Sequence, residues 1–418
     1  MRSFAKRMDE RTKKILMVIA LIVVTLILGF ILYLFATDRA IPGLPFGRPT
    51  STSSGDQLPA SQQRTSTPVG PDGRPLQPGQ TFNPASATQP NSYYQPQPVV
   101  RRNTDAIAFP QGNFTNGGLR YYNQGDGKFY RVGANGSIET LSDQVFFNVS
   151  AVTWAPNNDK AVLEYPDKTK IVYNFDTKKQ VTLPKHWEDF SFSTDGTEIA
   201  AKSMSLSPEN RVLLITKDDG TGERAIQELG NYADRVNVDW SPSRQTVALS
   251  QTGDPIGGER RQILLIGKNQ ENFKPITTEG LDFQSQWSPS GQHLLYSVDS
   301  SRTDFKPELW VTEAYGDSID NNRRSLQINT WAKKCAFADE TTLYCAVPRD
   351  LPAGSGLLPD SAAYTTDDLF RIDVKTGARV GIPLDGVNRR ISSLSFDKNS
   401  NKLFFTDRSE LGLFEVKL

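Results

Sequence analysis

Two stretches of this chain, WSPSRQTVALS at residues 240–250 and WSPSGQHLLYS at residues 287–297, have the same order of residue types. In each stretch an aromatic residue precedes a polar turn that contains proline, and an apolar run follows the turn. Proline fixes φ at the first central position of a tight turn, and Gly, Asn or Asp tolerates the left-handed conformation that comes next. Each stretch therefore predicts a β-hairpin whose first strand ends at the aromatic residue.

Weaker copies of this hairpin phrase recur along the chain. Their anchoring aromatic residues are Phe109, Trp154, Phe192, Phe337 and Phe396. With Trp240 and Trp287 included, the intervals between anchors are 45, 38, 48, 47, 50 and 59 residues. Repeats of about 40 to 50 residues with several short strands are typical of propeller blades. We therefore predict an all-β, seven-bladed β-propeller over residues 101–418, with six blades as the alternative if the Phe109 phrase is not a hairpin.

Four strands in each repeat are indicated by runs rich in β-branched and aromatic residues. The fourth repeat has such runs at 236–240, 245–250, 262–266 and 274–276. The fifth repeat has them at 283–287, 293–298, 309–312 and 325–327. The last repeat has only three, at 391–396, 402–406 and 412–416. We expect residues 97–100 to supply its fourth strand and so to close the ring.

The phrase at 287–291 and its relative at 240–243 resemble the repeats of the TolB-like propeller superfamily and of the propeller domain in the dipeptidyl peptidase IV family. The resemblance extends over about residues 105–418, although the copies at Phe337 and Phe396 lack the proline. It implies a rigid binding platform, and it bears on the fold far more than on the function.

The N-terminal region predicts a membrane anchor. Residues 15–36 are 22 positions without a charge, enough for a helix of about 33 Å against a hydrocarbon core of about 30 Å. A cleaved signal peptide, the alternative, has a shorter apolar region and a small-residue cleavage site. Residues 1–14 carry six basic and two acidic side chains, so the positive-inside rule places them in the cytoplasm and everything after Thr37 outside the cell.

Residues 37–100 separate this anchor from the predicted propeller. Between positions 40 and 100, Pro, Ser, Thr and Gln occupy 33 of 61 positions, a composition that buries little apolar surface. We predict a disordered linker that acts as a spacer rather than as a ligand for proline-binding domains.

The charge distribution argues against nucleic acid as a partner. The whole chain is neutral, but the part beyond residue 100 has 37 basic and 42 acidic residues, a net charge of −5. Binding to phosphates requires a concentrated basic face, and the basic residues occur only as isolated pairs in the sequence.

The two cysteines of the chain, Cys335 and Cys345, flank one of the predicted turns. A three-residue loop at 339–341 would place them opposite each other on one side of a hairpin. Facing residues reach the Cα separation that a disulfide needs, and exported domains are where such bonds persist. We predict a disulfide between them, with two buried thiols as the alternative.

No catalytic, cofactor-binding or metal-binding constellation is found in the sequence. A Gly-x-Ser-x-Gly elbow is absent, which excludes the hydrolase domain that accompanies dipeptidyl peptidase propellers. The only histidines, His186 and His293, are expected to be structural, and a zinc site would need more His and Cys residues. We therefore expect a protein that is not an enzyme and has no cofactor.

Long connections between second and third strands are the best candidates for a binding site, because long loops on a rigid scaffold often carry function. They cover residues 251–261, 299–308 and 347–367. The last of these insertions contains four large apolar side chains: Leu351, Leu357, Leu358 and Tyr364. We predict that they bind a partner; the alternative is that the insertion packs over its own blade.

The sequence thus predicts a membrane-anchored, extracytoplasmic propeller that binds a protein or an envelope polymer as a scaffold. Two alternatives stay open: a propeller enzyme of the glycosidase or lyase type with carboxylates at the central channel, and a ligand sensor that signals through the anchor. Carboxylates with raised pKa values in a deep central pocket would favour the enzyme.

Overall fold

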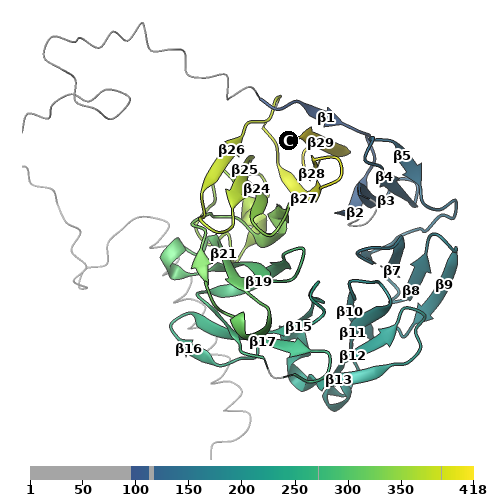
Figure 1. Cartoon of the computed structure of the whole chain (residues 1–418). Coiled ribbons are helices and arrows are strands. Elements are labelled where there is room, and N and C mark those ends of the chain that lie inside the picture. The colour runs from purple at the N-terminus through teal and green to yellow at the C-terminus, as the bar shows by residue number, and fades with distance from the viewer. Residues whose placement is uncertain (1–95, 113–116, 272, 387) are drawn as a thin grey trace, which may run out of the picture. The chain divides into compact units, whose positions relative to one another are not determined.

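Seven antiparallel sheets follow one another around a ring in the computed structural model (Figure 1). The structure describes residues 96–112, 117–271, 273–386 and 388–418. The predicted seven-bladed, all-β propeller is therefore confirmed, and the six-bladed alternative is wrong. We number the blades one to seven along the chain.

The first three blades have four strands each. Blade one contains β2 (Ile107–Gly112), β3 (Leu119–Asn123), β4 (Lys128–Val132) and β5 (Ile138–Thr140). Blade two contains β6 (Ala151–Trp154), β7 (Lys160–Glu164), β8 (Lys170–Asn174) and β9 (Lys179–Leu183). Blade three contains β10 (Trp187–Phe192), β11 (Glu198–Ser203), β12 (Val212–Lys217) and β13 (Arg224–Glu228).

The next three blades repeat this scheme. Blade four contains β14 (Val236–Val238), β15 (Thr246–Ser250), β17 (Arg260–Gly267) and β18 (Ile276–Thr278), with an additional short strand, β16 (Pro255–Gly257). Blade five contains β19 (Leu281–Trp287), β20 (His293–Asp299), β21 (Pro307–Glu313) and β22 (Arg324–Ser325). Blade six contains β23 (Cys335–Phe337), β24 (Thr342–Pro348), β25 (Asp367–Asp373) and β26 (Arg379–Ile382).

Blade seven combines both ends of the described chain. Its strands are β27 (Ile391–Asp397), β28 (Lys402–Asp407), β29 (Leu413–Lys417) and, as the outermost strand, β1 (Val99–Arg101). Val99 pairs with Val416, and its amide donates to Asp385 Oδ1 at 2.7 Å. Figure 1 shows β1 beside β29 at the C-terminus. The predicted closure of the ring is confirmed.

Six short 3-10 helices lie in the connections of the described part. They are η2 (Pro208–Asn210), η3 (Gly230–Arg235), η4 (Ser301–Thr303), η5 (Gly316–Ser318), η6 (Ala332–Lys334) and η7 (Pro359–Ala362). None of the helices in the described residues is long and apolar enough to cross a bilayer. The predicted cytoplasmic segment 1–14, the anchor 15–36 and the linker up to residue 95 lie outside the described residues.

The serine of the hairpin phrase explains why the phrase forms a turn. In blade five, Ser288 Oγ accepts a hydrogen bond from the amide of His293 at 3.0 Å, five residues later. Ser241 makes the same bond to Thr246 in blade four, also at 3.0 Å. Gly291 takes the left-handed conformation in this turn, with φ of 74°. The side chain thus satisfies a backbone donor where the ladder begins.

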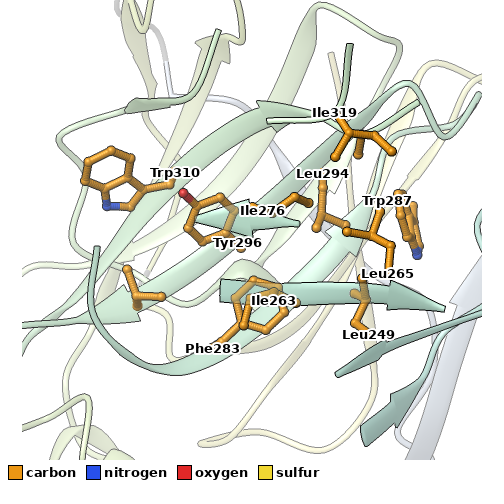
Figure 2. Close-up of a cluster of buried hydrophobic side chains, with 12 residues drawn as sticks. Leu249, Ile263, Leu265, Ile276, Phe283, Trp287, Leu294, Tyr296, Trp310 and Ile319 are labelled. Carbon is orange, nitrogen blue, oxygen red and sulfur yellow. The ribbon is translucent and has the colours of Figure 1, made fainter. Parts of the chain in front are cut away.

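The anchoring tryptophans join neighbouring blades. The indole Nε1 of Trp287 in blade five donates to the backbone oxygen of Asp239 in blade four at 3.3 Å, and Trp154 in blade two donates to Phe109 in blade one at 3.0 Å. Figure 2 shows Trp287 within a buried cluster to which blade four contributes Leu249 and Leu265. The predicted role of these anchors in core packing is confirmed.

The Phe109 phrase is not the turn that the sequence predicts. Phe109 and Pro110 lie inside β2, at a bulge between Ala108 and Gln111, and Phe109 has a φ of 51°. Because a bulge leaves an unpaired residue, it tolerates a proline that has no amide hydrogen to donate. The first blade exists, and its β2 and β3 pair as far as Gly112 and Leu119.

Candidate functional site

One face of the propeller carries the long connections. In an antiparallel sheet, the starts of the first and third strands lie at the same edge as the ends of the second and fourth. The connections between blades and those between second and third strands therefore share a face. The long connections of blades four, five and six lie on it, between β15 and β17, β20 and β21, and β24 and β25.

The blade-six insertion, residues 349–366, is held on its neighbour. The amides of Gly354 and Gly356 donate to the backbone oxygens of Asp304 and Phe305 in blade five, each at 2.8 Å. Ser355 between them is fully buried. A Cβ atom at Gly356 would lie 2.4 Å from the Cβ of Asp299, so only glycine fits there. The alternative expectation, that the insertion packs over its own blade, is wrong for this part of it.

The connection of blade four also contacts blade five. Glu259 Oε2 accepts hydrogen bonds from the amide of Ser301 at 2.9 Å and from its hydroxyl at 3.2 Å. The blade-five connection is therefore bonded to the long connections on both of its sides. The three connections form one continuous surface, which we call the loop face.

The predicted binding residues differ in how far they reach solvent. Leu357, Leu358 and Tyr364 are 50%, 70% and 84% exposed, whereas Leu351 is half-buried. Leu357, Leu358 and Tyr364 are thus exposed apolar side chains of one insertion, which is bonded to blade five at Gly354 and Gly356. The proposed binding role of all four residues stays a prediction.

A small pocket opens beside this apolar group, at the junction of blades six and seven. Four separate segments line it. The first contains Trp331, Lys333 and Lys334, and the second is the insertion together with Asp367. The third is Arg390 to Ser392, and the fourth is Arg408. Pro359 and Thr365 of the insertion belong to the lining, and they adjoin Leu358 and Tyr364 in the chain. The sequence reasoning missed this pocket because no local pattern indicates that these four segments meet.

The only acidic side chain of the pocket lining is already paired. Asp367 Oδ1 lies 2.5 Å from Lys334 Nζ, and its Oδ2 accepts from the amide of Ile391 at 2.7 Å. Burial raises the pKa of Asp367 and lowers the pKa of Lys334, and in each case the attraction of the partner only partly offsets burial. The ion pair therefore joins the first and third strands of blade six at a cost in desolvation, and Asp367 links them to blade seven through the amide of Ile391.

The other basic groups of the pocket lack such partners. In the described part of the chain, no ion pair involves Lys333, Arg390 or Arg408. The Arg390 guanidinium lies 5.9 Å from the centre of the Tyr364 ring. The indole nitrogen of Trp331 is buried without a hydrogen-bond partner among the described residues. Four basic side chains against one carboxylate give this pocket a positive charge in an acidic domain.

Two carboxylates elsewhere in the propeller have raised pKa values: Asp239 directly follows β14, and Asp299 ends β20. Burial, followed by the nearby charge of Asp189, raises the pKa of Asp239 to about 7. The side chain of Asp189 links blade three to blade four, because its Oδ2 accepts a hydrogen bond from the amide of Val238 at 2.9 Å. Burial and then the charge of Asp282 raise the pKa of Asp299 to about 6. Neither Asp239 nor Asp299 lines the basic pocket.

Over the described ranges, no group of three or more His, Cys, Asp or Glu side chains is placed to hold a metal ion. His293 Nδ1 lies 3.2 Å from Glu340 Oε2 and thereby links blade five to blade six.

The two cysteines lie as the predicted register requires. Cys335 pairs with Cys345, and the amide of Ala338 donates to the oxygen of Thr342 at 2.9 Å, which leaves a three-residue loop. The structure joins the two sulfur atoms in a disulfide. The bond closes the first hairpin of blade six, directly after the Lys334 that lines the pocket.

No protein-family model matches the chain, and no curated protein matches it either. Among solved structures, it is similar to the β-propeller domain of Cps50 (Swd1) from Myceliophteria thermophila, with 11% identity, a TM-score of 0.52 and coverage of 77% of this chain and 100% of that one. An oligogalacturonate lyase from Vibrio parahaemolyticus is 12% identical, with a TM-score of 0.50 and coverage of 76% of this chain and 93% of that one. TolB from Acinetobacter baumannii is 12% identical, with a TM-score of 0.43 and coverage of 68% of this chain and 64% of that one. Identities this low show the propeller fold alone.

Proposed function

We propose that this chain is a membrane-anchored, extracytoplasmic binding scaffold whose loop face contacts a protein partner. The observation that carries the proposal is the exposed apolar group Leu357, Leu358 and Tyr364 on an insertion that is bonded to blade five. A backbone that is fixed before binding loses little conformational freedom when a partner docks. A rigid platform with one apolar group is thus suited to recognition.

A covalent crosslink tests whether the loop face contacts a protein partner. A photo-reactive residue replaces Leu358 in the full chain, and a matched variant carries it at Tyr315, which is 50% exposed in the connection between β21 and β22 on the opposite face. We expect a discrete adduct in intact cells at position 358 that protease treatment removes, and none at position 315. The same adduct from both positions, or none from position 358, would contradict the proposal. An adduct that resists protease would indicate an envelope polymer instead.

The location outside the membrane rests on the uncharged segment 15–36, the basic residues before it and the disulfide, which suits an oxidising compartment. Single cysteines introduced as Ser3→Cys and Ser61→Cys test the topology. A membrane-impermeant maleimide should label position 61 in intact cells and position 3 only after lysis. Labelling of position 3 in intact cells, or of neither position, would reject this topology.

An enzyme is the second candidate, and the raised pKa of Asp239 favours it because general acids need such shifts. The similar structures include an oligogalacturonate lyase, so oligogalacturonate is a suitable first substrate. Formation of unsaturated product by the purified chain, and its loss in Asp239→Asn, would establish the enzyme. Absence of product would leave the scaffold as the better account.

A further inference from the structure

The basic pocket at the junction of blades six and seven collects positive charge that suits a bound anion. Lys333, Lys334, Arg390 and Arg408 converge on it, while the domain as a whole is acidic. Like charges placed together repel one another, and the charges of Arg408 and Lys333 add to burial in lowering the pKa of Lys334. A bound anion would relieve this repulsion.

The hydrogen-bonding groups of the lining fit an oxyanion. Arginine presents a planar fork of donors that matches a carboxylate or a phosphate, and such charge-assisted bonds are the strong ones. The indole of Trp331 is a further donor without a partner in the described residues. Asp367, the one acid of the lining, is occupied by Lys334 and by the amide of Ile391. An incoming anion therefore meets little repulsion.

The surroundings of the pocket indicate which molecule carries the anion. Leu358 and Tyr364 directly adjoin residues that line it, and Arg390 lies against the Tyr364 ring. Two large exposed apolar side chains therefore lie close to the pocket. A peptide with acidic and leucine-like side chains matches both parts, whereas a sugar phosphate polymer lacks apolar groups of that size.

We propose that this pocket binds a carboxylate of an acidic, apolar segment in the protein partner, while Leu357, Leu358 and Tyr364 contact the apolar side chains beside it. The proposal rests on the proposed scaffold function and specifies the chemistry of its partner. Arg390 and Arg408 bind the carboxylate. Lys334 is held by Asp367 and adds to the positive potential of the pocket.

Binding of defined peptides to the purified full chain tests this assignment. The probe is a fluorescently labelled nine-residue peptide with a Leu-Asp-Leu-Asp-Leu core, and its control has Asn in place of each Asp. Inorganic phosphate serves as the competitor. We expect the acidic peptide to bind at least about tenfold more tightly than the Asn peptide and to be displaced by phosphate. Its affinity should fall as salt rises, because salt screens charges.

Three variants locate the binding site. Arg390→Ala and Arg408→Ala remove cations that make no ion pair among the described residues, so the fold should persist. Arg371→Ala is the matched control, an exposed arginine of blade six that does not line the pocket. Each of the first two should weaken binding of the acidic peptide about tenfold, and the control should change it less than twofold. Unchanged melting temperatures would show that folding is intact.

Several results would overturn the proposal. Equal binding of both peptides, or unchanged affinity in Arg390→Ala and Arg408→Ala, would show that no carboxylate binds there. Binding of phosphate without binding of the peptide would reject a peptide source. If the crosslink at position 358 still forms in these cases, only the pocket assignment fails and the scaffold proposal stands.

Discussion

Lys334 Nζ and Asp367 Oδ1 lie 2.5 Å apart, and this ion pair connects the start of the innermost strand of blade six to the start of its third strand. The second oxygen of Asp367 accepts the amide of Ile391, at the start of the innermost strand of blade seven. One buried carboxylate therefore fixes the junction at which the basic pocket forms.

Asp367→Ala should destabilise the protein by about 3–5 kcal/mol, because it leaves a buried lysine and a buried amide without their partner. Asp360→Ala is the control, since Asp360 lies exposed in the same insertion. Urea denaturation measures the free energy of unfolding of both variants. A loss for Asp367→Ala no larger than that of the control would show that the pair does not hold the junction.

The raised pKa of Asp239 predicts a specific pH dependence of stability. Its pKa is about 7 in the folded chain and about 4 in the unfolded chain, so between these values the folded state binds more protons. Stability attributable to this group therefore falls as pH rises from about 4 to 7, and stays low above 7. The charge of Asp189 and burial are the causes.

Asp239→Asn should remove this dependence and raise stability at pH 8 by on the order of 1–3 kcal/mol, allowing for the partial contact of Asp239 with solvent. At pH 4 the variant and the parent should be about equally stable. Asp254→Asn, an exposed acid of the same blade, is the control. Parallel pH profiles of parent and Asp239→Asn would contradict the assignment.

The disulfide between Cys335 and Cys345 predicts that the denatured protein has no free thiol before reduction and two after it. Thiol titration of the native chain, isolated without reductant, measures this. The double variant Cys335→Ser, Cys345→Ser should lose about 2–3 kcal/mol, because a crosslink over ten residues restricts the unfolded chain. Two thiols before reduction would place the domain in a reducing compartment.

Because β1 closes the ring, we predict that the melting temperature of a truncated variant depends on whether it keeps β1. A variant that starts at residue 96 keeps β1, and one that starts at residue 104 loses it together with the ion pair of Arg102 and Glu415. The shorter variant should melt at least about 5 °C lower, because the buried Phe414 and Val416 of β29 lose their cover. Equal melting temperatures would show that β1 does not close the ring.

Much of the fold could be predicted because the determinants are local. The Ser288 turn and the strands around Trp287 follow from residue types within one hairpin, and the shortage of strands after Ile391 indicated that an N-terminal strand closes the ring. The Phe109 phrase misled because a bulge and a turn use the same residue types. The basic pocket could not be predicted, because Lys334, Arg390 and Arg408 meet only through the packing of two blades.

Gly356→Ala tests how the insertion is held, because the added Cβ would clash with Asp299 in blade five. We expect faster proteolysis within residues 349–366 and weaker crosslinking at position 358. Gly381→Ala in β26 is the control, since a Cβ there meets its nearest atom at an ordinary 3.7 Å. Equal proteolysis of the two variants would contradict the docked insertion.

We infer that the insertion is a fixed part of the loop face before any partner binds. Amide hydrogen exchange of the free full chain measures this at Gly354 and Gly356, whose amides are bonded to blade five. We predict exchange at least about 100-fold slower than in an unstructured peptide, since protected amides exchange only when the structure opens. Exchange of both amides at the unstructured rate would contradict the claim.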